Sequence, residues 1–225
     1  MKNIIAFSLW GDNPMYWKGA LENIELAKKY YPGWYCRFYI DDKSDINLIE
    51  TIKGDNVEVI LVSSKDSFEG MFWRFYASAD PDVDIFISRD TDSRLSEREY
   101  YAVQEWLRSN KDFHIMRDHK YHTVPILGGM WGCRNGLMRS DKLDILNKIK
   151  SWIYFKQKGC DQDFLGQIIY PCVVNKSMEH SEFGLRFGGN IIPFPTKRKD
   201  YEFVGDVFDE NNNRHPEYWK IIKNN

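Results

Sequence analysis

Two aspartates stand one residue apart at the end of a short apolar segment. Val83–Ser88 is apolar and rich in β-branched side chains, which is typical of a buried strand, and Asp90-Thr91-Asp92 follows it closely. Carboxylates this close raise each other's pKa unless a cation lies between them. A hard divalent ion with oxygen ligands, Mg²⁺ or Mn²⁺, would remove that cost. We interpret the pair as metal ligands, and the alternative is two solvated aspartates in a turn.

The segments around this pair alternate between expected strands and expected helices. Strands are predicted at residues 3–9, 35–40, 57–62, 83–88, 113–117, 126–133 and 172–175. Helices are predicted at residues 14–31, 68–79, 96–110, 141–158, 161–170 and 216–223. This order predicts an α/β fold with a mixed, mainly parallel sheet flanked by helices. Ligands of such sheets bind beyond the carboxyl ends of the strands, so we expect Asp41 and the Asp90–Asp92 pair to converge on one crevice.

Length and composition limit the classes of protein. The chain has 225 residues, 43% of them apolar, which predicts one globular domain spanning residues 1–225. Lys and Arg number 31 and Asp and Glu 33, so no basic field favours nucleic acid as a partner. The four cysteines form no Cys-x-x-Cys pair, which favours free thiols. No apolar run approaches the length of a membrane span, and we expect a cytoplasmic protein.

Four segments carry a resemblance to a known family. They are the strand ending in Asp90-Thr91-Asp92, the aromatic-arginine stretch at residues 71–76, Gly128-Gly129-Met130-Trp131-Gly132, and Asp161-Gln162-Asp163-Phe164-Leu165. In this order and spacing the chain resembles nucleotide-sugar glycosyltransferases of the GT-A fold, and is distantly similar to the glycogenin and lipopolysaccharide galactosyltransferase group. One departure concerns the metal. The family often closes the metal shell with a histidine before Gly-x-x-Lys-Pro-Trp, whereas His180 precedes Ser-Glu-Phe-Gly.

The resemblance implies an activity. It implies a GT-A (Rossmann-like) hexosyltransferase in polysaccharide biosynthesis that uses Mn²⁺ or Mg²⁺. The donor would be a nucleoside diphosphate sugar, with UDP expected and GDP as the alternative, and the acceptor a hydroxyl of a glycan or related molecule.

The resemblance also implies roles for particular residues. The implied metal ligands are Asp90, Asp92 and His180. The implied catalytic carboxylates are Asp163, placed slightly ahead, and Asp161; the alternative is that both only begin a helix. The residues expected to bind nucleotide and sugar are Phe7, Leu9, Asp41, Arg74, Asp90, Thr91, Gly128, Gly129 and Gln162.

Several alternatives stay open on the sequence alone. An Asp-x-Asp phosphohydrolase would use its first aspartate as a nucleophile after the first strand, but here the pair follows the fourth. A non-catalytic sugar-binding module would use the eight tryptophans. His119 and His122 are interpreted as loop residues, with a role on the acceptor side as the alternative. The Gly-rich and Pro-rich stretch at residues 184–199 is expected to close over a ligand.

Overall fold

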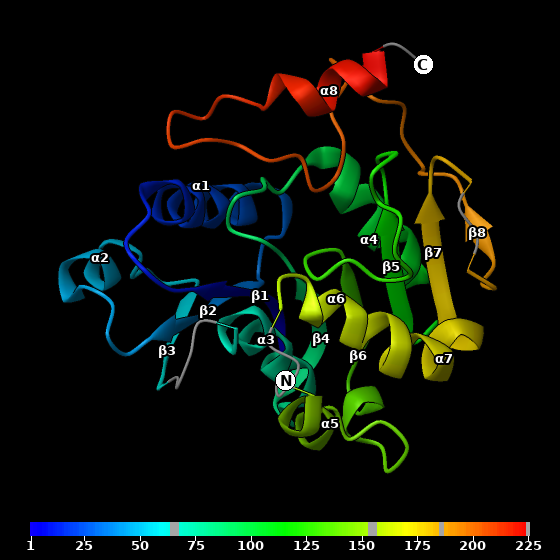
Figure 1. The fold of residues 1–225 in the computed structure, drawn as a ribbon, viewed down its shortest axis with the longest axis horizontal. Coiled ribbons are helices and arrows are strands. Elements are labelled where there is room, and N and C mark those ends of the chain that lie inside the picture. The colour runs from blue at the N-terminus through cyan, green and yellow to red at the C-terminus, as the bar shows by residue number, and fades with distance from the viewer. Residues whose placement is uncertain (64–67, 153–156, 185–186, 224–225) are drawn as a thin grey trace.

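The computed structural model describes residues 1–63, 68–152, 157–184 and 187–223. Its eight strands in these ranges form one sheet in the order β3-β2-β1-β4-β6-β5-β7-β8. The strands are β1 (Lys2–Leu9), β2 (Tyr35–Asp41), β3 (Val57–Val62), β4 (Val83–Ser88), β5 (Phe113–Arg117), β6 (Trp131–Arg134), β7 (Ser177–Ser181) and β8 (Ile191–Ile192). Figure 1 shows β3 toward one end of the sheet and β7 and β8 at the other.

All neighbouring strands are parallel except where β6 meets β4 and β5. The predicted mixed, mainly parallel sheet is therefore confirmed. Helices connect the strands: α1 (Pro14–Tyr30), α2 (Ile46–Thr51), α3 (Gly70–Trp73) with a 3-10 helix (Arg74–Ala79), α4 (Glu97–Arg108), α5 (Ile145–Trp152), α6 (Cys160–Phe164), α7 (Tyr170–Val173) and α8 (Pro216–Lys223). Asn13 begins α1, where its side chain accepts a hydrogen bond from the Met15 amide.

The sheet separates two apolar layers because successive strand residues point to opposite faces. Ile5 and Phe7 of β1 pack with Trp17 of α1 and Trp106 of α4 in one layer. The β1 residues between and beside them, such as Ile4 and Ala6, pack in the other layer, which also contains residues of α3, α5 and α6. Helices thus cover both faces, as the alternating order predicts.

The switch in strand order lies between β1 and β4. The chain runs from β1 to β2 and β3 on one side, and then crosses to β4 on the other side of β1. Because β1 and β4 are parallel, Leu9 and Ser88 end at the same edge of the sheet. The antiparallel strand β6 begins at that edge, since Trp131 pairs with Ser88. This edge is where a ligand site is expected.

Three predicted elements were wrong, and a fourth, the helix predicted at residues 141–158, begins only at Ile145, with residues 153–156 outside the described part of the chain. Residues 172–175 belong to α7 and a following 3-10 turn, and the strand forms later, at β7. Of the segment 126–133 only residues 131–133 lie in a strand, β6, which continues to Arg134; Gly128 and Gly129 lie in the loop before it. Pro171 does not end the helix that begins near Asp161. The chain continues through a π-helical turn, Leu165–Ile169, into α7. Pro171 lies in the first turn of α7, where its lack of an amide hydrogen is tolerated.

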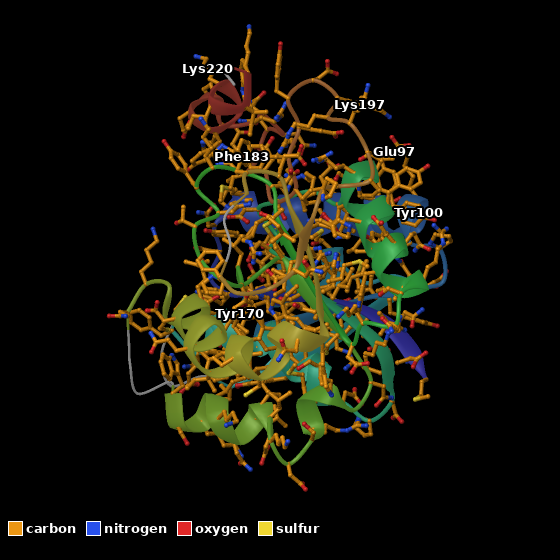
Figure 2. All side chains as sticks on the ribbon, turned by 90° about the vertical axis from the view of Figure 1, so that its right-hand side faces the viewer. Glu97, Tyr100, Tyr170, Phe183, Lys197 and Lys220 are labelled. Atoms are coloured by element: carbon orange, nitrogen blue, oxygen red, sulfur yellow. The ribbon has the colours of Figure 1, made fainter. Side chains whose placement is uncertain are left out.

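The C-terminal segment, which follows β8, crosses the edge of the sheet at which β1 and β4 end. Ser93 pairs with Val207 in an antiparallel bridge, and the Phe208 amide donates to the Asp92 carbonyl oxygen at 2.9 Å. Figure 2 shows Lys197 and Lys220 of this segment at the same end of the molecule as Glu97 of α4. In the described part of the chain, no helix combines the length and apolarity needed to cross a membrane.

Candidate functional site

A cavity of about 490 Å³ opens at the edge of the sheet where β1 and β4 end. Eight residues predicted from the sequence line it: Leu9, Arg74, Asp90, Thr91, Asp92, Gly128, Asp161 and Gln162. They come from β1, the 3-10 helix after α3, the loop after β4, the loop before β6, and α6. Segments far apart in sequence therefore meet at the predicted crevice.

Arg74 is the centre of the charged part of the cavity. Its side chain is buried, with Nη1 at 3.0 Å from Asp90 Oδ1 and Nη2 at 3.0 Å from Asp161 Oδ2. Its Nε donates to the Gly128 carbonyl oxygen at 3.3 Å, and its amide donates to Ser8 Oγ. A planar guanidinium suits such a set of acceptors. Arg74 thus fixes two carboxylates from well-separated segments of the chain, the loop after β4 and α6, in one arrangement.

Gly128 and Gly129 are required by this arrangement. A Cβ atom on Gly128 would overlap Arg74 Nη2 and Asp161 Oδ2, and one on Gly129 would overlap the Asp90 carboxylate. The glycines therefore let the backbone approach the charged side chains closely. The sequence predicted that something approaches this backbone, and the structure identifies the protein's own carboxylates and arginine.

The Asp92 carboxyl group has a perturbed pKa. Burial, followed by the negative charge of Asp90, raises the pKa of Asp92 to about 7, against the opposing effect of Arg74. Burial also raises the pKa of Asp161, although Arg74 opposes the shift. The pKa of the Tyr16 hydroxyl is raised as well, mainly by burial and then by the negative charges of Asp92 and Asp90. The cavity therefore concentrates negative charge that a bound cation would stabilise.

The carboxylates of the cavity fit a divalent cation that takes its remaining ligands from a bound molecule. Among the described residues, no group of three His, Cys, Asp or Glu side chains could hold a metal ion alone. Mg²⁺ is commonly bound by one or two carboxylates plus phosphate oxygens. Asp92, with its raised pKa, and Asp90 supply two such carboxylates in one cavity.

His180 does not lie at the cavity, which corrects the prediction that it is a metal ligand. It is fully buried in β7 instead of following a strand. Its Nδ1 lies 2.8 Å from Nε2 of His114, and its Nε2 lies 3.1 Å from Glu105 Oε2. Both ring nitrogens are therefore occupied by protein groups, and neither is free to bind a metal.

Four other predicted residues lie off the cavity lining. Asp163 accepts a hydrogen bond from Gln157 at 2.9 Å, so Asp161 and not Asp163 is the carboxylate of α6 that faces the cavity. Phe7 is in the core, stacked on Phe38 at 4.9 Å between ring centroids. Asp41 accepts a hydrogen bond from the Lys43 amide in the turn after β2. Gly129 packs against the Asp90 carboxylate without lining the cavity itself.

The remaining lining residues were not predicted as site residues, although a role on the acceptor side was the alternative for His122. They are Ser8, Trp10, Tyr16, Met71, His122, Leu127, Met130, Lys158, Gly159 and Gly205. Trp10 directly follows β1, and Lys158 lies two residues before α6, so proximity to predicted motifs could have identified both. Gly205 gave no such indication, since only the folded C-terminal segment brings it to the cavity.

Comparison with solved structures places the fold. A glycosyltransferase involved in glycosylation of the major capsid of PBCV-1 is 14% identical, with a TM-score of 0.50 over 80% of this chain and 82% of that one. A 4-diphosphocytidyl-2C-methyl-D-erythritol synthase of Anaerococcus prevotii DSM 20548 is 13% identical, with a TM-score of 0.50 over 82% and 91%. The glycosyltransferase GlyE of Streptococcus pneumoniae TIGR4 is 10% identical, with a TM-score of 0.50 over 80% of this chain but 45% of GlyE.

The chain shares their fold. The fold expected from the resemblance to GT-A glycosyltransferases is thus confirmed, and glycosyltransferases are among its structural neighbours. At these identities the likeness concerns the fold alone. By sequence, the chain matches no family model and no curated protein.

Proposed function

We propose that this protein transfers a sugar from a nucleoside diphosphate sugar, with UDP as the first nucleotide to test, to a hydroxyl of a glycan or related acceptor. One observation carries the proposal. Asp90, Asp92 and Asp161 line a single cavity at the switch point of the sheet, and Arg74 fixes two of them. Nucleotide ligands of parallel sheets bind at this position. The fold shared with known glycosyltransferases supports the same proposal.

Asp92 and Asp90 would hold Mn²⁺ or Mg²⁺ together with the diphosphate of the donor. Such an ion supplies neutralisation of the charge that develops on the leaving nucleoside diphosphate. The raised pKa of Asp92 supports this assignment, because a cation would keep that carboxylate ionised at neutral pH.

Asp161 would act on the sugar end of the donor, and Arg74 would hold it in place. Arg74 is committed to Asp90 and Asp161, so its role is to position both carboxylates. Asp161 then presents a fixed carboxylate to the donor sugar, where it can accept a hydroxyl hydrogen or stabilise positive charge at the anomeric carbon. Most of the rate enhancement would come from such positioning and charge stabilisation.

Lys158 would bind the phosphates. It is exposed at the rim of the cavity, next to Gly159 and α6, and it forms no ion pair with any of the described residues. The other cationic side chain in the lining, Arg74, is already paired. An ammonium group with no partner can serve a mobile diphosphate as a point charge.

A donor panel tests the proposal. The protein is incubated with UDP-sugars and GDP-sugars, with Mn²⁺, with Mg²⁺, or with chelator, and release of the nucleoside diphosphate is measured. We expect release from at least one donor that requires the cation and is lost in Asp92→Asn. The matched control is Asp84→Asn, which changes an exposed aspartate of β4, the strand that precedes the loop with Asp90 and Asp92.

Other products would identify other functions. Inorganic phosphate from simple phosphate esters would favour the phosphohydrolase alternative, and glycan retention without any release would favour a binding module. Release that survives both chelator and Asp92→Asn would contradict the assignment of the Asp-x-Asp residues.

A further inference from the structure

His122 lies in the loop between β5 and β6, and it lines the cavity beside Met130 and Gly205. Its Nδ1 lies 2.9 Å from the backbone nitrogen of Asp118. A backbone N–H can only donate, so Nδ1 must be the acceptor and carries no hydrogen. The ring hydrogen of neutral His122 is therefore on Nε2.

The orientation of the ring is held by its surroundings. Asp118, whose amide bonds to Nδ1, is buried and forms ion pairs with Arg98 at 2.8 Å and Arg198 at 2.6 Å. The ring packs edge-on against Phe203, with 6.0 Å between ring centroids, and lies beside His119 at 5.7 Å. His122 thus cannot turn without breaking its bond to a fixed backbone group.

The ring stays neutral at physiological pH. Burial, followed by the charges of His119, Arg198 and Arg117, lowers the pKa of His122 to about 3. Nε2–H is therefore available as a neutral hydrogen-bond donor at physiological pH. Among the described residues it has no hydrogen-bond partner, which leaves it free for a ligand in the cavity.

We propose that His122 is a positioning residue whose Nε2–H donates a hydrogen bond to a hydroxyl oxygen of a sugar bound in the cavity. The inference rests on the proposed function. A neutral donor suits a hydroxyl better than a phosphate, for which the cavity offers Lys158. The apolar neighbours Leu127 and Met130 provide a surface for the C–H face of a sugar ring. The hydroxyl can belong to the donor sugar or to the acceptor sugar.

Kinetics with deoxy sugars test the role and identify which sugar is bound. His122→Phe removes the donor, and His122→Gln restores an N–H at the end of the side chain. The control is Tyr121→Phe, which removes one hydroxyl from an exposed residue of the same loop that does not line the cavity.

We expect His122→Phe to lower kcat/KM about ten-fold for the natural sugar pair, in keeping with the loss of one neutral hydrogen bond. One deoxy donor or one deoxy acceptor should be used equally well by wild type and variant, since its missing hydroxyl is the one bound by Nε2–H. We expect His122→Gln to recover part of the loss and Tyr121→Phe, a surface change, to stay within about two-fold of wild type. Unchanged kinetics for His122→Phe, or an equal loss with every deoxy sugar, would overturn the proposal.

Nitrogen NMR of the histidine rings tests the inference without relying on turnover or on a variant that folds. Wild-type protein is recorded between pH 5 and pH 8, alone and with free monosaccharides or with UDP. We expect the His122 signal to stay neutral with hydrogen on Nε2, and to shift with a sugar but not with UDP. If a sugar shifts the His122 signal but the protein releases nucleoside diphosphate from no donor, the contact with the sugar is supported and the proposed function is rejected. A neutral ring that carries its hydrogen on Nδ1, or a signal that no sugar shifts, would overturn the contact itself.

Discussion

At the scale of single residues, the cavity depends on which side chains of a motif face inward. Asp161 and Asp163 are two residues apart on α6, so their side chains point about 200° apart around the helix axis. Only one can face the cavity. The sequence predicted the motif but favoured Asp163, because nothing in the local pattern shows which side of a short helix meets the sheet. The bond from Arg74 to Asp161 decides the question.

Asp161→Asn should reduce turnover far more than Asp163→Asn. The first change removes the carboxylate fixed by Arg74 in the cavity, and the second removes one that accepts a hydrogen bond from Gln157 outside it. We expect kcat to fall on the order of 10²-fold for Asp161→Asn and to change little for Asp163→Asn. Steady-state release of nucleoside diphosphate measures both. Equal losses would mean that the helix faces the substrate differently.

Gly129→Ala should destabilise the fold as well as the site. Its Cβ would overlap the Asp90 carboxylate, which Arg74 holds in place. We expect a loss of about 1–3 kcal/mol in the free energy of unfolding, as for other overpacked sites. Gly54→Ala is the control, since a Cβ there has ordinary contacts. Urea unfolding compares the two variants, and equal stability would contradict the tight packing described for Gly129.

His180 shows a different limit of sequence reasoning at this scale. A histidine late in the chain was predicted to reach the metal, but it lies inside β7 with both ring nitrogens bonded to protein groups. Its contacts depend on β7 pairing with β5, which aligns it with Met116. Pairing between strands more than sixty residues apart leaves no mark in a local pattern.

At the scale of elements, α1 supports the loop that carries the aspartates. Asn23 of α1 is buried, donates to the Ser93 carbonyl oxygen at 2.8 Å and accepts from the Leu95 amide at 2.9 Å. Gly19 lets the helix lie against Thr91, because a Cβ there would overlap the Thr91 carbonyl oxygen. The helix was predicted from its cap and apolar face, whereas this contact with the site was not.

Asn23→Ala should loosen that loop. It leaves a buried carbonyl and a buried amide without their partner, which we expect to cost about 2–4 kcal/mol of unfolding free energy. The KM for the donor should rise as well, since Asp92 lies just before Ser93. Lys18→Ala, an exposed change on the same helix, is the control. Urea unfolding and donor kinetics test both effects, and a stable variant with normal KM would show that α1 does not hold the loop.

Elements were well predicted wherever the hydrophobic period and the caps agreed. Val57–Val62, Val83–Ser88 and Phe113–Arg117 match the predicted strands residue for residue. The error at residues 172–175 arose because the β-branched Val173 and Val174 favour a strand locally. In the folded chain Val173 is fully buried in the core at the end of α7, so tertiary packing overrides that preference.

At the scale of the whole molecule, the site is assembled from both ends of the chain. The convergence of β1 and β4 followed from the alternating order, and could be predicted. The return of the C-terminal segment to Asp92 and Ser93 could not, since it depends on isolated contacts such as the bridge to Val207. Gly205, which this segment brings to the cavity, was therefore missed.

Acid should destabilise the folded chain partly through His122. Its native pKa of about 3 lies below the ordinary value of 6.5, so between these values the unfolded chain binds more protons than the folded one. Its contribution is present above pH 6.5 and is lost as the pH falls. Between pH 7.5 and 5.5, the unfolding free energy of wild type should fall by about 1.3 kcal/mol more than that of His122→Gln. Urea unfolding at the two pH values measures this, and parallel pH profiles would contradict the neutral buried ring.

The most direct test of the central claim is the melting temperature of the protein with UDP, with Mn²⁺, and with both. If Asp90 and Asp92 hold a cation that also binds the diphosphate, each ligand completes the site of the other. We predict that the two together raise the melting temperature by more than the sum of their separate shifts, and that Asp92→Asn removes the excess while Asp84→Asn keeps it. Shifts that simply add in the wild type, or a UDP shift that chelator leaves unchanged, would contradict the account.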